Sequence, residues 1–297
     1  MPRTLNDCPA PAKINLFLHI TGQREDGYHL LQTVFQLIDF CDTLHFSERP
    51  DGIIRRTTTL PDIPEATDLT VRAAQLLQSE LMRQTGRKPG ADIVIEKHLP
   101  IGGGLGGGSS DAATTLLALN QLWQCHFSRA QLMKLGVQLG ADVPFFLLGQ
   151  NAFAEGIGEI LTPIDTPLSW FILIDPRVPV PTARIFASED LTRNTEVVTM
   201  PDFLGGIRNE EMWGRNDLQS VAEKQYPAIA SAVRWLNRYA PARMTGSGAC
   251  VFARASSEQE ADRIVLEVPV GWKGWKARGL GTHPLDARLS ACTNRQA

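Results

Sequence analysis

The sequence predicts an α+β protein of two domains, and three observations support this. First, 297 residues with 43% hydrophobic content provide enough apolar surface for two ordinary cores. Second, each half of the chain contains both strand-like alternation and helical spacing of apolar residues. Third, residues 163–169 are polar and contain prolines, so we expect a boundary between domains 1–163 and 164–297.

Composition excludes several classes of function. The 29 Lys and Arg residues balance 32 Asp and Glu residues, and a net charge of −3 gives no general attraction to nucleic acid or to an anionic membrane. Hydrophobic runs stay below the roughly 18 residues that span a bilayer, and the five cysteines show neither a Cys-x-x-Cys pair nor metal-ligand spacing. We expect a cytoplasmic protein without a nucleic-acid or membrane partner. A small-molecule substrate and a monomeric or weakly dimeric state are also expected, but composition does not decide them.

Residues 12–20 predict a strand with two different faces. One face is wholly aliphatic and carries Ile14, Leu16, Leu18 and Ile20. The other carries Lys13 and Asn15, which are therefore expected to be neighbours. A lysine opposite an aliphatic face belongs either to a solvated edge or to a functional site, and taken alone a surface position is the commoner case.

An Asp-Gly turn signal ends the polar residues 23–27 and precedes a second β-rich segment at residues 28–40. Tyr28 and His29 follow this turn directly. Helical spacing predicts a helix over residues 68–82, and residues 93–95 predict a short strand.

A glycine-rich loop follows that strand, and residues 111–123 then show helical spacing. Residues that almost all lack a Cβ atom tolerate positive φ and let backbone N–H groups approach an anion closely, while the following helix points its positive end at the same place. A flexible linker is the alternative, but a strand and a helix flank the loop too tightly for that. The predicted phosphate-binding residues are Pro100, Ile101, Gly102, Gly103, Gly104, Leu105, Gly106, Gly107, Gly108, Ser109 and Ser110.

This loop differs from two common nucleotide-binding loops. It lacks the Gly-Lys-Ser/Thr ending of a P-loop, and no acidic residue stands at the end of a following strand in the register of a Rossmann fold.

Asp142 stands after a second predicted helix, residues 128–139, which opens with a capping box of Ser128 and Gln131 and stops at Gly140. Its position before a proline is typical of a helix N-cap. Phosphoryl transfer to an alcohol, however, needs charge neutralisation and an acceptor for the hydroxyl proton. Lys13 and Asp142 fit these two roles, and the cap and the catalytic role do not exclude each other.

The second half of the chain shows both kinds of periodicity as well. Strands are expected at residues 170–174 and 249–253, and helices at residues 216–223, 227–239 and 257–266. The last helix begins with a capping box of Ser257 and Glu260. A second glycine-rich turn, Thr245-Gly-Ser-Gly-Ala249, lies between two β segments.

Five motifs together resemble the GHMP kinase superfamily, and within it the enzymes of the non-mevalonate isoprenoid pathway that phosphorylate a cytidine-diphosphate-linked polyol. They occur in the family's order and span nearly the whole chain: Pro11-Ala-Lys-Ile-Asn-Leu16, Gly27-Tyr-His29, the loop at residues 100–110, Leu139-Gly-Ala-Asp-Val-Pro-Phe145 and Thr245-Gly-Ser-Gly-Ala249. The resemblance implies a ribosomal-protein-S5-like N-terminal domain, a ferredoxin-like C-terminal domain and an active site in the cleft between them.

The resemblance also implies roles for individual residues. Asp142 accepts the proton of the attacking hydroxyl and Lys13 stabilises the developing alkoxide, with ATP as co-substrate and Mg²⁺ arriving mainly with ATP. Substrate contacts are implied for Asn15, Tyr28, His29, Thr182 and Phe186, with the cytosine ring between Tyr28 and Phe186 and His29 bonded to its edge. The match around Thr182 and Phe186 is loose, so a turn threonine and a core phenylalanine stay open.

Three matters stay open in the sequence. A related kinase acting on mevalonate or homoserine is one alternative, and a nucleotide sensor without catalysis is another. The candidate magnesium ligands are Ser109, Ser110, Asp111 and Glu155, and the sequence does not choose among them. Residues 192–212 match no motif of the family, and the tail after Leu289 is expected to be extended and polar.

Overall fold

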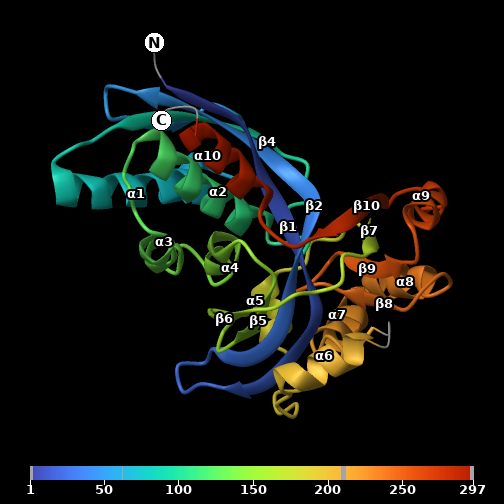
Figure 1. Ribbon diagram of the computed structural model, residues 1–297. Helices are drawn as coiled ribbons and strands as arrows, with labels where there is room; N and C mark the ends of the chain where they lie inside the picture. Colours follow the sequence, from blue (N-terminus) through green and yellow to red (C-terminus); the bar gives the residue numbers. More distant parts are fainter. Residues whose placement is uncertain (1–2, 62, 209–211, 295–297) are drawn as a thin grey trace.

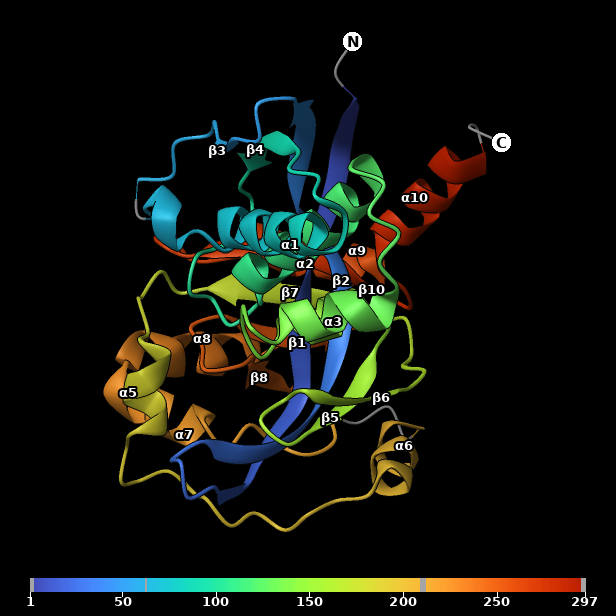
Figure 2. The same ribbon diagram turned by 90° about the vertical axis from the view of Figure 1, so that its left-hand side faces the viewer.

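Two long antiparallel strands run through both halves of the molecule and form the centre of its sheet. The computed structural model describes residues 3–61, 63–208 and 212–294. Strands β1 (Thr4–Gln23) and β2 (His29–Arg49) run from the top to the bottom of the views in Figures 1 and 2. Both were predicted, but shorter. The pairing passes through four register shifts, and such bulges bend a strand without ending it, so one strand serves both halves of the molecule.

The remaining strands extend the sheet on both sides of β2. The sheet order is β3 (Ile54–Arg56), β4 (Gly90–Glu96), β2, β10 (Lys273–Leu280), β7 (Trp170–Asp175), β9 (Val251–Ala255) and β8 (Ala242–Met244). Strand β5 (Ala152–Glu155) also pairs with β2, and β6 (Ile160–Pro163) pairs with β5. Strand β10 pairs with β2 near its end and with β7 along most of its length, so the last strand of the chain joins the two halves.

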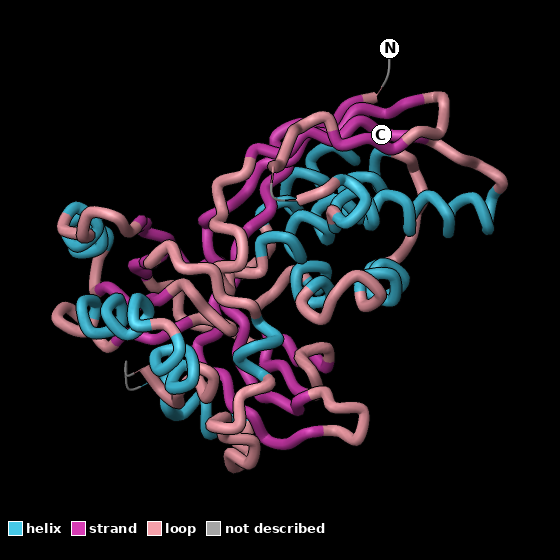
Figure 3. The backbone as a smooth tube through the Cα atoms, turned by 180° about the vertical axis from the view of Figure 1, so that it is seen from behind, coloured by secondary structure: helices cyan, strands magenta, loops and turns pink. Residues whose placement is uncertain are grey.

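Helices cover one face of the upper sheet, as Figure 3 shows. They are α1 (Leu69–Thr85), which follows the short 3₁₀ helix Glu65–Thr67, then α2 (Gly107–Leu122), α3 (Arg129–Gly136), α4 (Val143–Leu148) and α10 (Pro284–Asn294). Their apolar sides pack with β1, β2 and β4 into a core that includes the fully buried Trp123, Phe46 and Phe145. Leu285 of α10 belongs to the same core, so this last described helix packs on the N-terminal half. It continues to Asn294, so the expectation of an extended tail after Leu289 was wrong for these residues. The division into 1–163 and 164–297 stays a prediction.

The lower half packs a second core beneath β7, β8 and β9. Helices α5 (Thr182–Phe186), α7 (Gln219–Gln225), α8 (Pro227–Leu236) and α9 (Glu258–Leu266) contribute to this core. Helix α6 (Met200–Arg208) packs instead through Phe203 in a small separate cluster with Phe17. Leu18 and Ile20 of β1 are buried in this core, whereas Ala10 of the same strand is buried in the upper one. Lys13 and Asn15 lie between these two stretches, and this places them where the halves meet.

Local sequence signals predicted the starts of several helices. Asp68 caps α1 by accepting from the Thr70 N–H, and both hydrogen bonds of the Ser128/Gln131 capping box are present. Ser257 accepts from the Glu260 N–H, but the Glu260 carboxylate accepts from Ser256, so only half of that predicted box forms.

Several expected boundaries were wrong, among them the starts of α2, α7 and β9. Helices α3 and α8 end three residues before the expected positions, and β4 begins three residues before its expected start. Helix α2 starts four residues earlier than expected, inside the glycine-rich loop. Helix α7 starts three residues later, because the side chain of Asn216 donates to the carbonyls of Met244 and Gly246 and accepts from the Leu218 N–H. Strand β9 starts two residues after the predicted position because residues 245–250 form the glycine-rich turn. Within the described ranges, no helix is long and apolar enough to cross a membrane.

Candidate active site

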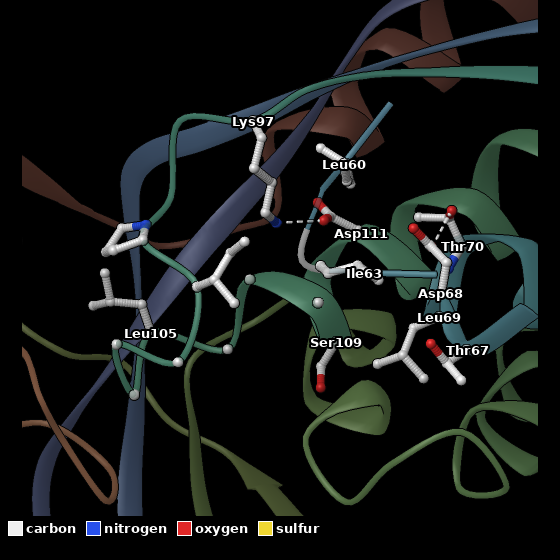
Figure 4. Close-up of a pocket in the computed structure, with 18 residues that line it drawn as sticks. Leu60, Ile63, Thr67, Asp68, Leu69, Thr70, Lys97, Leu105, Ser109 and Asp111 are labelled. Carbon is white, nitrogen blue, oxygen red and sulfur yellow. Dashed lines mark hydrogen bonds and ion pairs between the residues drawn. The ribbon is translucent and has the colours of Figure 1, made fainter. Parts of the chain in front are cut away.

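The glycine-rich loop forms one wall of a cavity of about 360 Å³ (Figure 4). The first turn of α1 and the segment before it form the opposite wall, with both apolar and polar side chains. The lining comprises Leu60, Ile63, Thr67, Asp68, Leu69, Thr70, Lys97, Asp111 and residues 100–109. Of the predicted loop residues, Ser110 alone lies outside this lining, and its fully buried hydroxyl has no hydrogen-bond partner among the described residues.

Positive φ angles give the loop its shape. Gly102, Gly104 and Gly106 have φ values of 72°, 75° and 73°, in the region that L residues with a Cβ avoid. Gly106 is the N-cap of α2, so the free N–H groups of the first helical turn come from Gly107 onward, within the loop itself. Free amides and the positive helix end at one cavity wall fit a phosphate group.

Lys97 fixes the start of the loop through two buried carboxylates. Its ammonium group lies 2.5 Å from Asp42 and 2.6 Å from Asp111, and Figure 4 shows Lys97 and Asp111 pointing toward each other. Asp42 also accepts from the N–H groups of His98 and Leu99. Burial raises the pKa of the Asp111 carboxyl, and the Lys97 ammonium opposes this rise. The sequence did not single out Lys97, although a cation three residues before the loop is a usable signal.

Lys13 lies where the two glycine-rich segments meet. Its side chain is 4% exposed, and its Nζ donates to the Asn15 Oδ1 at 2.7 Å and lies 5.2 Å from the centre of the Phe35 ring. A Cβ on Gly106 would come within 3.2 Å of the Lys13 Cε, and one on Gly246 within 3.5 Å of its Nζ. The predicted contact between Lys13 and Asn15 is confirmed. The solvated-edge interpretation of Lys13 is wrong, because the ammonium is enclosed.

Asp142 is the carboxylate beside this ammonium group. Its Oδ2 lies 3.6 Å from the Lys13 Nζ, and its side chain keeps 32% of its surface exposed. It stands at the N-cap position of α4, yet its side chain makes no capping hydrogen bond. The cap interpretation therefore does not explain this carboxylate, whereas the neighbouring cation does.

Asn15 and the Thr245-Gly-Ser-Gly turn hold Lys13 in place. The Asn15 backbone N–H donates to the Thr245 Oγ1 at 3.0 Å, and its side-chain amide donates to the Thr33 Oγ1 at 2.9 Å. The turn also contacts the loop: a Cβ on Gly104 would lie 2.2 Å from the Thr245 carbonyl oxygen. Asn15, predicted to contact substrate, is buried and uses both ends of its side chain within this network.

A second cavity, of about 770 Å³, includes Ala141, the residue before Asp142, in its lining. It brings together four of the five predicted substrate residues: Tyr28 from the β1–β2 turn, His29 from the start of β2, and Thr182 and Phe186 from α5. Its other lining residues are Gln23, Asp26, Gly27, Leu31, Ala141, Ile157, Ala183, Ala187 and Arg193. The His29 and Phe186 rings lie 5.1 Å apart, and Tyr28 is 60% exposed.

Thr182 links the second cavity to the glycine-rich turn, because its hydroxyl hydrogen-bonds the Ser247 hydroxyl at 2.7 Å. Gly106 of the loop cavity lies against Lys13, and Ala141 of the second cavity directly precedes Asp142, so the pair is adjacent to the linings of both cavities. The arrangement suits two ligands that meet at one ammonium and one carboxylate.

The structure does not assign a metal ion to a cluster of protein ligands. Among residues 3–61, 63–208 and 212–294, no three His, Cys, Asp or Glu side chains gather closely enough to hold one. Of the candidate ligands, Ser109 and Asp111 line the loop cavity. Glu155 instead accepts a hydrogen bond from Gln32 in β2, at 2.9 Å.

Comparisons with known proteins agree with this geometry. The models of the GHMP kinases N terminal domain and of the GHMP kinases C terminal match residues 68–150 and 204–272. A protein from Herminiimonas arsenicoxydans, named 4-diphosphocytidyl-2-C-methyl-D-erythritol kinase, is 62% identical over 96% of this chain and 98% of its own length. The chain belongs to the GHMP kinases. A protein of the same name from Ralstonia nicotianae is 59% identical over 96% of this chain and 97% of its own.

Solved structures place this GHMP kinase within the same fold. A crystal structure of 4-(cytidine 5′-diphospho)-2C-methyl-D-erythritol kinase matches with a TM-score of 0.78 and 31% identity, over 95% of this chain and 100% of that one. Homoserine kinase from Cytophaga hutchinsonii matches with a TM-score of 0.62 at 15% identity, over 94% and 95% of the two chains, and shows the fold alone. The predicted two-domain fold class and superfamily are confirmed, and the protein is an ATP-dependent small-molecule kinase.

Two glycines of the loop make a matched pair for testing this geometry. Gly102→Ala should cost about 1–2 kcal/mol, since it adds strain at positive φ but meets nothing within 4 Å. Gly104→Ala should cost clearly more and should weaken ATP binding, because its Cβ would collide with the Thr245 backbone. Urea unfolding and calorimetric titration with ATP measure both effects. Equal losses in the two variants would contradict the close contact between loop and turn.

Proposed function

We propose that this GHMP kinase transfers the γ-phosphoryl group of ATP to the 2-hydroxyl of 4-diphosphocytidyl-2-C-methyl-D-erythritol, a step of the non-mevalonate isoprenoid precursor pathway in the cytoplasm. One observation carries the proposal. Lys13 lies against Gly106 of the glycine-rich loop, and Asp142, 3.6 Å from its ammonium, directly follows Ala141, which lines the second cavity together with Tyr28, His29 and Phe186. The names of the relatives that cover nearly the whole chain support the same acceptor.

ATP binds in the loop cavity in this account. The triphosphate lies against the N–H groups of the first turn of α2, and the base lies between the apolar side chains of Leu60, Ile63 and Leu69. The residues of the loop that line the cavity, 100–109, contact the phosphates mainly through their backbone. This accounts for the scarcity of side chains in the loop.

Lys13 and Asp142 carry out the transfer. The acceptor oxygen attacks the γ-phosphorus, the bond to the β–γ bridging oxygen breaks and ADP leaves, and Asp142 takes the hydroxyl proton. Lys13 stabilises negative charge on the acceptor oxygen and on the γ-phosphoryl group. Its ammonium is already fixed by Asn15 and shielded from water, so little reorganisation accompanies the reaction.

Mg²⁺ is expected to enter this site bound to the phosphates of ATP. Phosphate oxygens and water supply most ligands of a nucleotide-bound Mg²⁺, and when bound it neutralises charge on the β- and γ-phosphates. The Ser109 hydroxyl is the protein oxygen at the loop cavity that suits it best. The carboxylate of Asp111 is engaged by Lys97 instead.

The cytidine group binds in the second cavity. Tyr28 and Phe186 provide aromatic surface for the base, and His29 provides a polar edge. A mevalonate- or homoserine-type acceptor has no group that needs these side chains. The second cavity therefore favours the cytidylyl substrate over the alternative acceptors.

Removing either member of the catalytic pair should abolish most turnover. Asp142→Asn and Lys13→Met should each lower kcat by roughly 10² to 10⁴ while ATP still binds, because a proton acceptor or a charge stabiliser is lost. Asp262→Asn is the control, since this carboxylate pairs with Lys276 at a distant, exposed site. Turnover like that of the wild type in a folded Asp142→Asn protein would rule out its role as base.

The acceptor itself tests the proposed function. CDP-methylerythritol should be phosphorylated far faster than free methylerythritol, mevalonate or homoserine, because binding of the remote cytosine positions the hydroxyl. Tyr28→Ala should cost about 1–3 kcal/mol of transition-state binding, the range for base–aromatic stacking, with ATP affinity nearly unchanged. Product mass analysis with kcat/KM for each acceptor measures this. A similar kcat/KM for mevalonate and the cytidylyl substrate would refute the acceptor assignment.

A further inference from the structure

Arg193, a residue that no motif of the sequence singled out, lines the second cavity beside His29. Its Nε–H donates to the His29 Nε2 at 3.1 Å. The rest of the guanidinium group donates to three backbone carbonyls that follow α5 or end it, those of Phe186, Ser188 and Leu191. These three bonds fix the plane of the guanidinium and so direct its Nε–H at the histidine ring.

The hydrogen bond from Arg193 decides which ring nitrogen of His29 carries the proton. A guanidinium group has N–H donors and no acceptor, so the Nε2 that receives its hydrogen bond must carry a lone pair. A neutral ring then carries its proton on Nδ1. Among the described residues, Arg193 is the hydrogen-bond partner of this ring, which leaves the Nδ1–H available to a ligand.

Burial and the charges near the His29 ring also favour its neutral form. Burial lowers the pKa of His29, and the positive charge of Arg193 lowers it further. The other titratable groups at this cavity are the Tyr28 phenol and Asp26, whose carboxylate is paired with Arg24 at 2.8 Å. A protonated His29 would bring two cations into contact and lose the Arg193 hydrogen bond, so the ring is held neutral.

We propose that Arg193 is a positioning residue that fixes His29 as the neutral Nδ1–H tautomer, so that the second cavity offers a ring N–H donor to an acceptor atom of a pyrimidine base. This rests on the proposed function for the nature of the ligand. Cytosine carries acceptors at O2 and N3, either of which suits such a donor. Arg193 therefore acts on substrate binding through His29, while the carbonyls at the end of α5 hold Arg193 in place beside Phe186.

The tautomer can be measured directly in the ligand-free protein. Nitrogen-15 NMR of the histidine rings should show His29 with its proton on Nδ1 and with a pKa below the ordinary value of 6.5. The protein contains six histidines, so a His29→Gln variant identifies the signals. In Arg193→Met the pKa of His29 should rise and the Nδ1–H tautomer should no longer be imposed. A wild-type ring with its proton on Nε2 would overturn the proposal.

Kinetics provide a second test. Arg193→Met should raise the KM for the cytidylyl substrate about tenfold, the effect of one hydrogen bond, with the KM for ATP unchanged. Arg184→Met is the matched control on α5, because its side chain is exposed and stacks on Tyr226 instead. In a His29→Ala background, Arg193→Met should change this KM by less than twofold. A full tenfold effect in that background would overturn a role that acts through His29.

The two proposals fail separately. The tautomer is measured without substrate, so a negative result with every acceptor would refute the kinase acceptor assignment and leave the NMR result intact. Rapid turnover of the cytidylyl substrate by a protein whose His29 carries its proton on Nε2 would refute only the role of Arg193.

Discussion

The enclosed ammonium group of Lys13 is the constraint on which the rest of this site depends. Removing a cation from water is costly unless polar groups replace the solvent, and here Asn15, Asp142 and the face of Phe35 do so. Each of these partners comes from a different segment of the chain. The glycine-rich loop and the Thr245-Gly-Ser-Gly turn close around the same group, so the position of one cation requires both halves to pack together.

The bent strand pair explains how this constraint is met. Strand β1 enters the upper core through Ala10 and the lower core through Leu18 and Ile20, and the bulges between them present Lys13 and Asn15 at the junction. The glycines near Lys13 allow backbone to approach backbone closely. The contacts between the glycine-rich loop and the Thr245-Gly-Ser-Gly turn therefore join the two halves and also enclose Lys13. A change that separates the loop from the turn is expected to lower stability and to disturb the position of Lys13.

Local signals in the sequence predicted many of the elements and the contact between Lys13 and Asn15. Alternation placed Lys13 beside Asn15, the Ser128 capping box started α3, and the glycine pattern identified the loop. What the sequence left undecided depends on contacts between distant segments. Whether Asp142 caps a helix or faces a cation is settled by Lys13, 129 positions earlier, and Arg193 gives no local sign because its partners are a ring from β2 and backbone carbonyls.

Two ligands that occupy separate cavities are expected to meet at the Lys13–Asp142 pair. A crystal structure of the protein with a non-hydrolysable ATP analogue and CDP-methylerythritol tests this expectation most directly. We predict the triphosphate at the glycine-rich loop, the cytosine between Tyr28 and Phe186, and the acceptor hydroxyl within hydrogen-bonding distance of Asp142. Both ligands in one cavity, or an acceptor hydroxyl remote from Asp142, would contradict the account.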